Sequence, residues 1–290
     1  MKKIRSKDGT PIAYKRSGEG PPLVLVHGTL ATHARWGAIT PALAEHFTVY
    51  AVDRRGRGES RDTQPYTLER EFEDVAAVAD AIGPGVNVLG HSHGGLCVLE
   101  AALRTDNLRS VIAYEPASAP VPDGLMDRIE ALLDAGEPEE AVITFVRDGV
   151  KMPPHELEKW RSTPAFPARV AVAHTIPREF RAVEAYQFKP ERFKHLDVPT
   201  LLLVGGDSPA FLKTGSEKWH AALPNSRIVE LPGQQHVAMD TAPDLFLREV
   251  QAFLAEVADL SKHRNQRQAG KRRLTTHPIS GAAKDDRYPT

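Results

Sequence analysis

The sequence predicts an α/β fold in which helices cover both faces of a mostly parallel, eight-stranded sheet. Short apolar runs alternate with helical segments through most of the chain. One of these runs, at residues 86–89, leads through a tight glycine-flanked turn straight into a helix. The alternation stops between residues 117 and 197, which indicates a helical insertion after the sixth strand.

Eight segments of strand-like sequence occur in an order that fits this fold. The first two, at residues 3–5 and 11–16, are joined across Asp8-Gly9, a hairpin pair, so we expect both as antiparallel edge strands. Residues 22–26, 47–52 and 110–114 are runs typical of strands that are buried on both faces of a parallel sheet. An apolar strand at residues 86–89 and two further strands at residues 200–204 and 227–231 complete the set.

Helical spacing of apolar residues marks the segments between the strands. Residues 36–47 show it first. Thr67 is a suitable N-cap for a helix that runs to Ile82. A small-residue, apolar helix follows the glycine-flanked turn at residues 96–103, and an amphipathic helix at residues 242–257 closes the sheet-forming part of the chain.

Prolines and glycines divide the inserted segment into several helices, which we expect to form a cap over the sheet. The expected helices span residues 124–134, 138–150, 154–161 and 167–186, the last with a break at Pro177. The predicted organisation is a core domain of residues 1–116 and 198–260, a helical cap of residues 117–197 and a tail of residues 261–290.

The tail differs from the rest of the chain in charge. Residues 261–290 hold eight Lys and Arg against two Asp, whereas the whole chain has a net charge of −1. Because this segment has no hydrophobic periodicity, we expect it to be disordered or loosely attached. A nucleic-acid-binding arm is the alternative, but the acidic balance of the remaining chain argues against nucleic acid as the main partner.

The composition is typical of a soluble globular protein, with 41% hydrophobic and 26% charged residues. No apolar run is long enough to cross a bilayer, and residues 1–9 contain no apolar segment of a signal peptide. We therefore expect a cytoplasmic location and no membrane partner. The single cysteine, Cys97, is expected to be a buried packing residue without chemistry of its own.

The turn after residues 86–89 has the sequence Gly90-His91-Ser92-His93-Gly94, the form of a nucleophile elbow. A serine in so tight a turn from strand to helix is forced into a strained backbone conformation. Glycines two residues before and after it leave room for the chain segments to pass. The serine hydroxyl is then held at the N-terminus of a helix, where developing negative charge is favoured.

Polar residues that follow the strands of such a sheet gather at its carboxyl edge. In this chain they are His27, Asp53, Ser92, Glu115, Asp207 and His236. A serine needs a base to take its proton, a histidine suits that task near neutral pH, and the histidine needs a carboxylate to hold its tautomer. The order Ser92, Asp207, His236 therefore predicts a catalytic triad.

From its N-terminal strands to about Ala258, the chain resembles the α/β-hydrolases that carry a helical cap. The resemblance rests on His27-Gly28, Asp53-Arg54-x-Gly56-x-Gly58-x-Ser60, Gly90-x-Ser92-x-Gly94-Gly95, Gly206-Asp207 and Gly233-x-x-His236. It implies an oxyanion hole made by the backbone N–H groups of Thr29 and His93, with Leu30 as the alternative to Thr29. His93 is a mild departure, since relatives more often have an apolar residue there.

The resemblance leaves two candidates for the triad acid, because some relatives carry it after the strand that Glu115 follows. We expect Asp207, since Glu115 stands directly before Pro116 and can instead orient loop backbone. His91 and His93 flank the serine without a cysteine or carboxylate at ligand spacing, so we expect no metal and no cofactor.

Two further motif positions are expected to be structural. Asp53 and Arg54 belong to a structural loop in relatives. We therefore expect them to take part in a buried ion pair and not in catalysis. His27 is expected to support the segment that follows it and carries Thr29, which is called the oxyanion loop after the role expected of Thr29.

Serine at position 92 argues against epoxide opening and halide displacement, because relatives that catalyse these reactions use aspartate at the elbow. The expected function is hydrolysis of a small carboxylic ester or lactone through an acyl-enzyme, with a small acyl molecule as the binding partner. Alternatives with the same triad are carbon–carbon bond hydrolysis, cofactor-free perhydrolysis of the haloperoxidase type and thioester hydrolysis. An alternative of another class is a slow-turnover ligand-binding receptor of the same fold.

Overall fold

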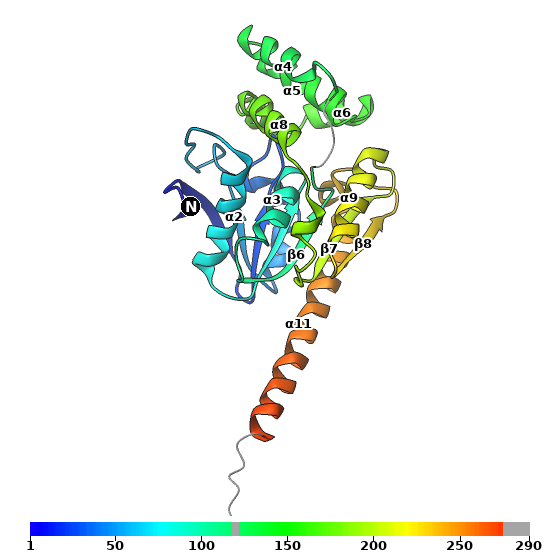
Figure 1. Ribbon diagram of the computed structural model, residues 1–290. Helices are drawn as coiled ribbons and strands as arrows, with labels where there is room; N and C mark the ends of the chain where they lie inside the picture. The colour runs from blue at the N-terminus through cyan, green and yellow to red at the C-terminus, as the bar shows by residue number, and fades with distance from the viewer. Residues whose placement is uncertain (118–121, 275–290) are drawn as a thin grey trace, which may run out of the picture.

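A computed structural model describes residues 1–117 and 122–274, and Figure 1 shows its arrangement. Its strands form one sheet in the order β1-β2-β4-β3-β5-β6-β7-β8. The pairs β1–β2 and β2–β4 are antiparallel and all other pairs are parallel. The strands are β1 (Lys2–Arg5), β2 (Pro11–Ser17), β3 (Pro22–Val26), β4 (Thr48–Val52), β5 (Val86–His91), β6 (Leu108–Tyr114), β7 (Thr200–Gly205) and β8 (Ser226–Leu231). The predicted mostly parallel, eight-stranded sheet is confirmed.

Two apolar cores lie on opposite faces of the sheet, and β3 contributes to both. Val24 and Val26 belong to one core, whereas Leu23 and Leu25 belong to the other, as the two-residue period of a strand requires. The first core includes residues of α2 (Leu68–Ile82), α3 (His93–Ala101) and α9 (Ala210–Ala222). The second includes residues of the 3-10 helix η1 (His33–Trp36), α1 (Thr40–Ala44), α10 (Ala238–Thr241) and α11 (Pro243–Leu274).

The core helices follow the sequence prediction in part. Helix α2 begins after Thr67, whose hydroxyl oxygen accepts a hydrogen bond from the Arg70 N–H, and it ends at Ile82 as predicted. The predicted helix at residues 36–47 is instead divided into η1 and α1. Helix α9, between β7 and β8, was not predicted.

The insertion between β6 and β7 is helical, and most of its helices lie together beyond one end of the sheet (Figure 1). They are α4 (Leu125–Asp134), α5 (Pro138–Thr144), the π-helical turn η2 (Phe145–Gly149), α6 (Pro154–Arg161), α7 (Phe166–Val170), the 3-10 turn η3 (Ala173–Thr175), α8 (Ile176–Ala185) and the 3-10 turn η4 (Pro190–Arg192). The break predicted at Pro177 lies just before this residue, since α8 begins at Ile176. Pro177 is in the first turn of α8, where proline is tolerated.

Helix α11 corrects part of the prediction for the tail. It extends to Leu274 and runs away from the sheet in Figure 1, so residues 261–274 continue a helix that the sequence pattern ended at Val257. A helix that is already packed needs no new nucleus, and Lys, Arg, Gln and Ala favour its extension without any apolar period. Residues 275–290, the rest of the predicted tail, lie outside the described residues. A search of the described helices finds none with the length and apolarity to span a membrane.

Candidate active site

Ser92 occupies the sharp turn between β5 and α3. Its φ of 54° and ψ of −120° lie in a region that costs a non-glycine residue about 1–3 kcal/mol. A methyl group on Gly90 would lie 2.2 Å from the carbonyl oxygen of Gly94, and one on Gly94 would lie 2.2 Å from that of Val26. Only glycine therefore fits at both positions, and the turn has the geometry that the elbow motif predicts.

The loop after β3 passes directly beside Ser92. A methyl group on Gly28 would lie 3.0 Å from the Cβ of Ser92. Thr29 and Leu30 line the same pocket as Ser92, and Leu30 adopts a left-handed φ of 57°. His93 is the first residue of α3, where backbone N–H groups have no partner within the helix. The Thr29 and His93 N–H groups remain the predicted oxyanion donors.

His27 ties this loop to the loop after β4. Its Nε2 accepts a hydrogen bond from the Arg54 backbone N–H at 3.1 Å, so its Nδ1 carries the proton and donates to the carbonyl of Gly28 at 2.8 Å. Burial, and then the charge of Arg54, holds the pKa of His27 well below its usual value, so the ring is neutral. This is the supporting contact expected for His27.

His236 stands in the loop after β8 and is held by a carboxylate from the residue that follows β6. Its Nδ1 lies 2.5 Å from Oε2 of Glu115, which is fully buried. The other carboxylate oxygen, Oε1, accepts the N–H of Gly205 at 2.8 Å. Because a carboxylate only accepts, Nδ1 carries the proton, and Nε2 of the neutral ring is the basic nitrogen.

The pairing of His236 with Asp207 that the sequence predicts is not the one found. Asp207 is exposed in the turn after β7, and its backbone N–H donates to the carbonyl of Gln234 at 2.9 Å. Glu115 follows β6 directly in a left-handed conformation with a φ of 43°, and its backbone N–H bonds to the carbonyl of Leu203 at 3.0 Å. These bonds hold Glu115 under the loop, so its carboxylate and not that of Asp207 reaches His236.

Two buried aromatic side chains fix the loop that carries His236. The hydroxyl of Tyr114 donates to the carbonyl of Gln235 and accepts the N–H of Ala238 at 3.2 Å. Nε2 of His91 donates to the carbonyl of His236 at 2.8 Å, and the two imidazole centroids lie 4.5 Å apart. Burial, and then His236, lowers the pKa of His91, so His91 is a neutral support for the loop. Its position next to Ser92 was the only sequence signal for this role.

Ser92 and His236 line one pocket between the carboxyl edge of the sheet and the cap. The pocket holds about 810 Å³ of space that atoms do not fill, part of it open to solvent. Most of its other lining is apolar and comes from the oxyanion loop and the cap, including Leu30, Phe145, Val146, Val150, Met152 and Phe180. An apolar lining with a few polar groups beside Ser92 and His236 suits a small organic molecule.

A buried charge cluster, made of Arg54, Arg57, Glu71 and Glu179, lies beneath the oxyanion loop. Arg54 binds both carboxylate oxygens of Glu71, at 2.8 and 2.9 Å. Oε1 of Glu179, from the cap helix α8, accepts bonds of 2.5 Å from Arg54 and from Arg57. Burial alone would raise the pKa of Glu71, but Arg54 outweighs it and leaves that pKa at about 2. The buried cluster therefore contains two positive and two negative side chains, and these charges cancel.

The cluster connects the cap with the oxyanion loop, because Oε2 of Glu179 accepts the hydroxyl of Thr29 at 2.9 Å. Arg54 is thus buried in ion pairs, as expected, but it pairs with Glu71 and Glu179 and not with Asp53. Asp53 instead accepts the backbone N–H and the Nδ1–H of His33, at 2.7 and 2.8 Å. Neither Glu179 nor His33 belongs to a motif of the sequence, so these partners could not be read from it.

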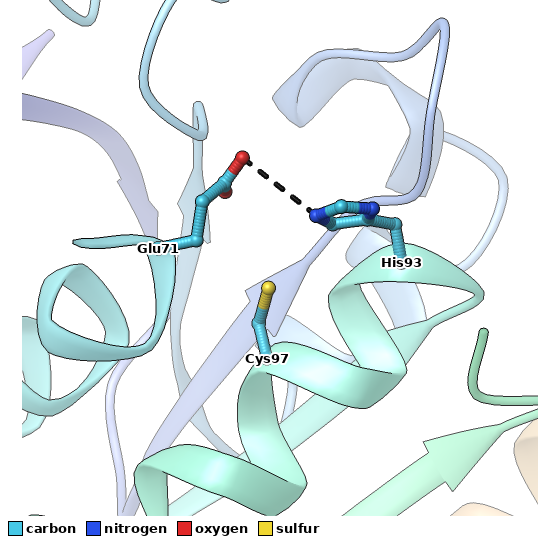
Figure 2. A group of neighbouring side chains, drawn as sticks. All are labelled: Glu71, His93 and Cys97. Atoms are coloured by element: carbon cyan, nitrogen blue, oxygen red, sulfur yellow. Dashed lines mark ion pairs between the residues drawn. The ribbon is translucent and has the colours of Figure 1, made fainter. Parts of the chain in front are cut away.

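His93, Glu71 and Cys97 offer the one group of metal-ligand atoms found among the described residues, and Figure 2 shows them facing one another. Their ligand atoms lie within 4.8 Å of one another, with Nε2 of His93 3.7 Å from Glu71. Arg54 already occupies both oxygens of Glu71 and repels a second cation. Burial raises the pKa of the Cys97 thiol, and burial followed by Arg54 lowers that of His93 to about 4. The group therefore does not fit a metal ion.

Replacing Glu179 by Gln should destabilise the protein by about 3–5 kcal/mol, because it leaves the buried charge of Arg57 without its carboxylate. The free energy of unfolding, measured by urea denaturation, checks this value. Glu184→Gln is the matched control, since Glu184 is exposed on the same helix. Equal stabilities of the two variants would contradict the importance given to the cluster.

The comparisons with known proteins agree with this fold. Residues 23–249 match the model of the alpha/beta hydrolase family. An alpha/beta hydrolase from Sphaerobacter thermophilus is similar over 87% of this chain and 100% of its own, with 40% identity and a TM-score of 0.78. The esterase RhEst1 from Rhodococcus sp. is 25% identical, with 88% of this chain and 98% of its own covered and a TM-score of 0.73.

A curated relative matches a shorter stretch. A probable oxidoreductase, EphD, of Mycobacterium tuberculosis is 35% identical over 133 residues, or 43% of this chain. The match covers only 22% of that protein's length. Since the family model covers most of the chain and the Sphaerobacter protein aligns over its whole length, this chain belongs to the alpha/beta hydrolase family.

Proposed function

We propose that this chain is a serine hydrolase that cleaves a small carboxylic ester or lactone through an acyl-enzyme intermediate. The observation that carries the proposal is the hydrogen bond between His236 and the buried Glu115, because it leaves a basic imidazole nitrogen in the pocket of Ser92. Nucleophile, base and acid then follow from these three residues. The likeness to an esterase from Rhodococcus supports an ester as the substrate.

In the first half of the reaction, Nε2 of His236 takes the hydroxyl proton of Ser92 while the serine oxygen attacks the substrate carbonyl carbon. The carbonyl π pair moves to oxygen and forms a tetrahedral oxyanion. When the oxyanion collapses, the bond to the leaving alkoxide breaks, and His236 gives the alkoxide its proton. In a lactone, the alcohol so released stays attached to the acyl group.

In the second half, water repeats these steps. His236 takes a proton from water, the hydroxide oxygen attacks the acyl carbon, and the second oxyanion collapses with release of Ser92, which recovers the proton from His236. Glu115 stabilises the imidazolium in both halves and keeps the ring in the useful tautomer.

The backbone N–H groups of Thr29 and His93 are proposed to bind the oxyanion. One such donor contributes about 3 kcal/mol to the stabilisation of the transition state. Two features support the assignment. The loop that contains Gly28 and Thr29 passes close to the Cβ of Ser92, and His93 is the first residue of helix α3, where a backbone N–H has no partner within the helix. The bond between Thr29 and Glu179 holds this loop in position from the cap side.

The proposal is tested by covalent labelling of the native chain with a fluorophosphonate, which phosphonylates activated serines. We expect one adduct per chain, located on Ser92 by peptide mass spectrometry. Chain unfolded in urea is the control and should stay unlabelled, because activation requires the folded arrangement. Labelling of another serine, or equal labelling of the unfolded chain, would contradict the assignment.

Kinetics with a p-nitrophenyl ester separates an enzyme from a receptor of the same fold. Sustained release of p-nitrophenol over many turnovers is the expected result. A burst of one equivalent followed by little further release would instead indicate a slow-turnover ligand-binding receptor.

A further inference from the structure

The catalytic pocket contains a guanidinium group that has no carboxylate partner among the described side chains. Arg169, on cap helix α7, lines the pocket together with Ser92 and His236. Its Nε is buried and makes no hydrogen bond to any residue that the structure describes. A buried N–H without an acceptor is costly, so it needs an explanation such as a ligand that supplies one.

The guanidinium of Arg169 is stacked on an aromatic ring. Its central carbon lies 4.6 Å from the ring centroid of Trp160, and Trp160 packs edge-to-face against Phe166 at 5.4 Å. Stacking uses the flat face of the guanidinium. Its N–H groups point outward in the plane, where they can hold a carboxylate with two parallel hydrogen bonds.

A second guanidinium adds positive charge to the same pocket. Arg35, from η1, also lines it and pairs with Asp240 at 2.5 Å. Burial, and then the charge of Arg35, lowers the pKa of Arg169 to about 10, so Arg169 is still protonated at neutral pH. Asp240 pairs with Arg35, so Arg169 has no carboxylate within ion-pair distance among the described side chains.

Glu156 is the one carboxylate among the residues that line the pocket. It accepts a hydrogen bond from Nε2 of Gln235 at 3.4 Å and lies 3.9 Å from Nε2 of His155. It makes no ion pair with Arg169 among the contacts of the described residues. Glu156 thus does not pair with Arg169, and its carboxylate opposes the binding of an anion in the pocket.

We propose that Arg169 binds an anionic group of the substrate, and that the substrate is an ester or lactone with a free carboxylate remote from the reacting carbonyl. This inference rests on the proposed hydrolysis at Ser92. The apolar side chains between the two ends, such as Phe145 and Phe180, would contact the hydrocarbon part of the molecule. Half-esters and lactones of dicarboxylic acids belong to this class.

The test compares kcat/KM for monomethyl glutarate and for methyl pentanoate, which are similar in length and differ in the terminal carboxylate. The unmodified chain should favour the half-ester by about tenfold or more, the range of a charged hydrogen bond. Arg169→Met should lower this ratio to about one. Arg169→Lys should give an intermediate ratio, since it keeps the charge and loses the planar fork.

Arg161→Met is the matched control, because Arg161 is an exposed cap arginine that pairs with Glu139 away from the pocket lining. Its ratio should equal that of the unmodified chain. Glu156→Gln should raise the ratio, because it removes a like charge. The inference would be overturned by a preference of the unmodified chain for the neutral ester, or by an unchanged ratio in Arg169→Met.

A binding measurement separates failure of this inference from failure of the proposed function. Calorimetry should detect binding of glutarate to the Ser92→Ala variant and its loss when Arg169→Met is added. If the unmodified chain hydrolyses neither ester, the proposed function fails, and the titration still decides the role of Arg169. Glutarate that binds equally well without the guanidinium, or does not bind with it, overturns the inference.

Discussion

Ser92→Ala should lower the turnover of p-nitrophenyl acetate to background, a loss of about 10⁶-fold in kcat. The variant has no hydroxyl to form the acyl-enzyme, and the remaining members of the triad act only through that hydroxyl. Alanine keeps the Cβ and tolerates the φ of 54° no worse than serine, so the turn between β5 and α3 should keep its conformation. Steady-state kinetics and thermal unfolding measure the two consequences separately.

Ser162→Ala is the control for this substitution, because Ser162 is exposed at the end of cap helix α6. It should retain full activity. A Ser92→Ala variant that is folded and still hydrolyses the ester would contradict the mechanism, since Ser92 is the one serine among the described residues that line the pocket of His236.

The elbow could be predicted from the sequence because its cause is local. The close approach of the Gly90 and Gly94 backbones excludes any side chain, and this steric requirement leaves a short, fixed spacing in the sequence. The buried parallel strands could be predicted for a similar reason. Both faces of β7 are covered, for example, and its sequence has the continuous apolar run Leu201 to Val204.

The carboxylate that contacts His236 could not be predicted from the sequence, because it depends on which side chain is long enough and suitably oriented to reach the imidazole. Glu115 and Asp207 both follow strands of the same carboxyl edge, and β6 and β7 are neighbours. The conformation of Glu115 and its bond to Gly205 turn its carboxylate toward His236. Neither a left-handed glutamate nor a contact between two strand ends leaves a pattern in a single sequence.

The contacts of the cap were beyond prediction for a related reason. Helical spacing indicates that α8 has a buried face, but it does not say which core residues that face meets. Glu179 is charged and fully buried, and only the positions of Arg54 and Arg57 in space explain why it is tolerated there. Arg169 likewise looks like an ordinary surface residue of a short helix until Ser92 is found in the same pocket.

Glu115→Gln should reduce kcat by about 10⁴-fold, because it forces His236 into the wrong tautomer. The N–H of Gly205 needs an acceptor, so the amide oxygen of the new side chain will face it and the amide N–H₂ will face Nδ1 of His236. Nδ1 must then accept, which moves the ring proton to Nε2. A protonated Nε2 cannot take the proton of Ser92.

The tautomer argument is distinguished from simple damage by comparison with Asp207→Asn, measured under the same conditions. Asp207 is exposed and its described backbone bond to Gln234 does not involve the carboxylate, so this variant should keep kcat within about threefold of the unmodified chain. Fluorophosphonate labelling of Ser92 should slow with the loss of kcat in Glu115→Gln and stay fast in Asp207→Asn. If Asp207→Asn is instead the damaging change, the acid that acts in catalysis is not the one that contacts His236 in this structure, and the role proposed for Glu115 is wrong.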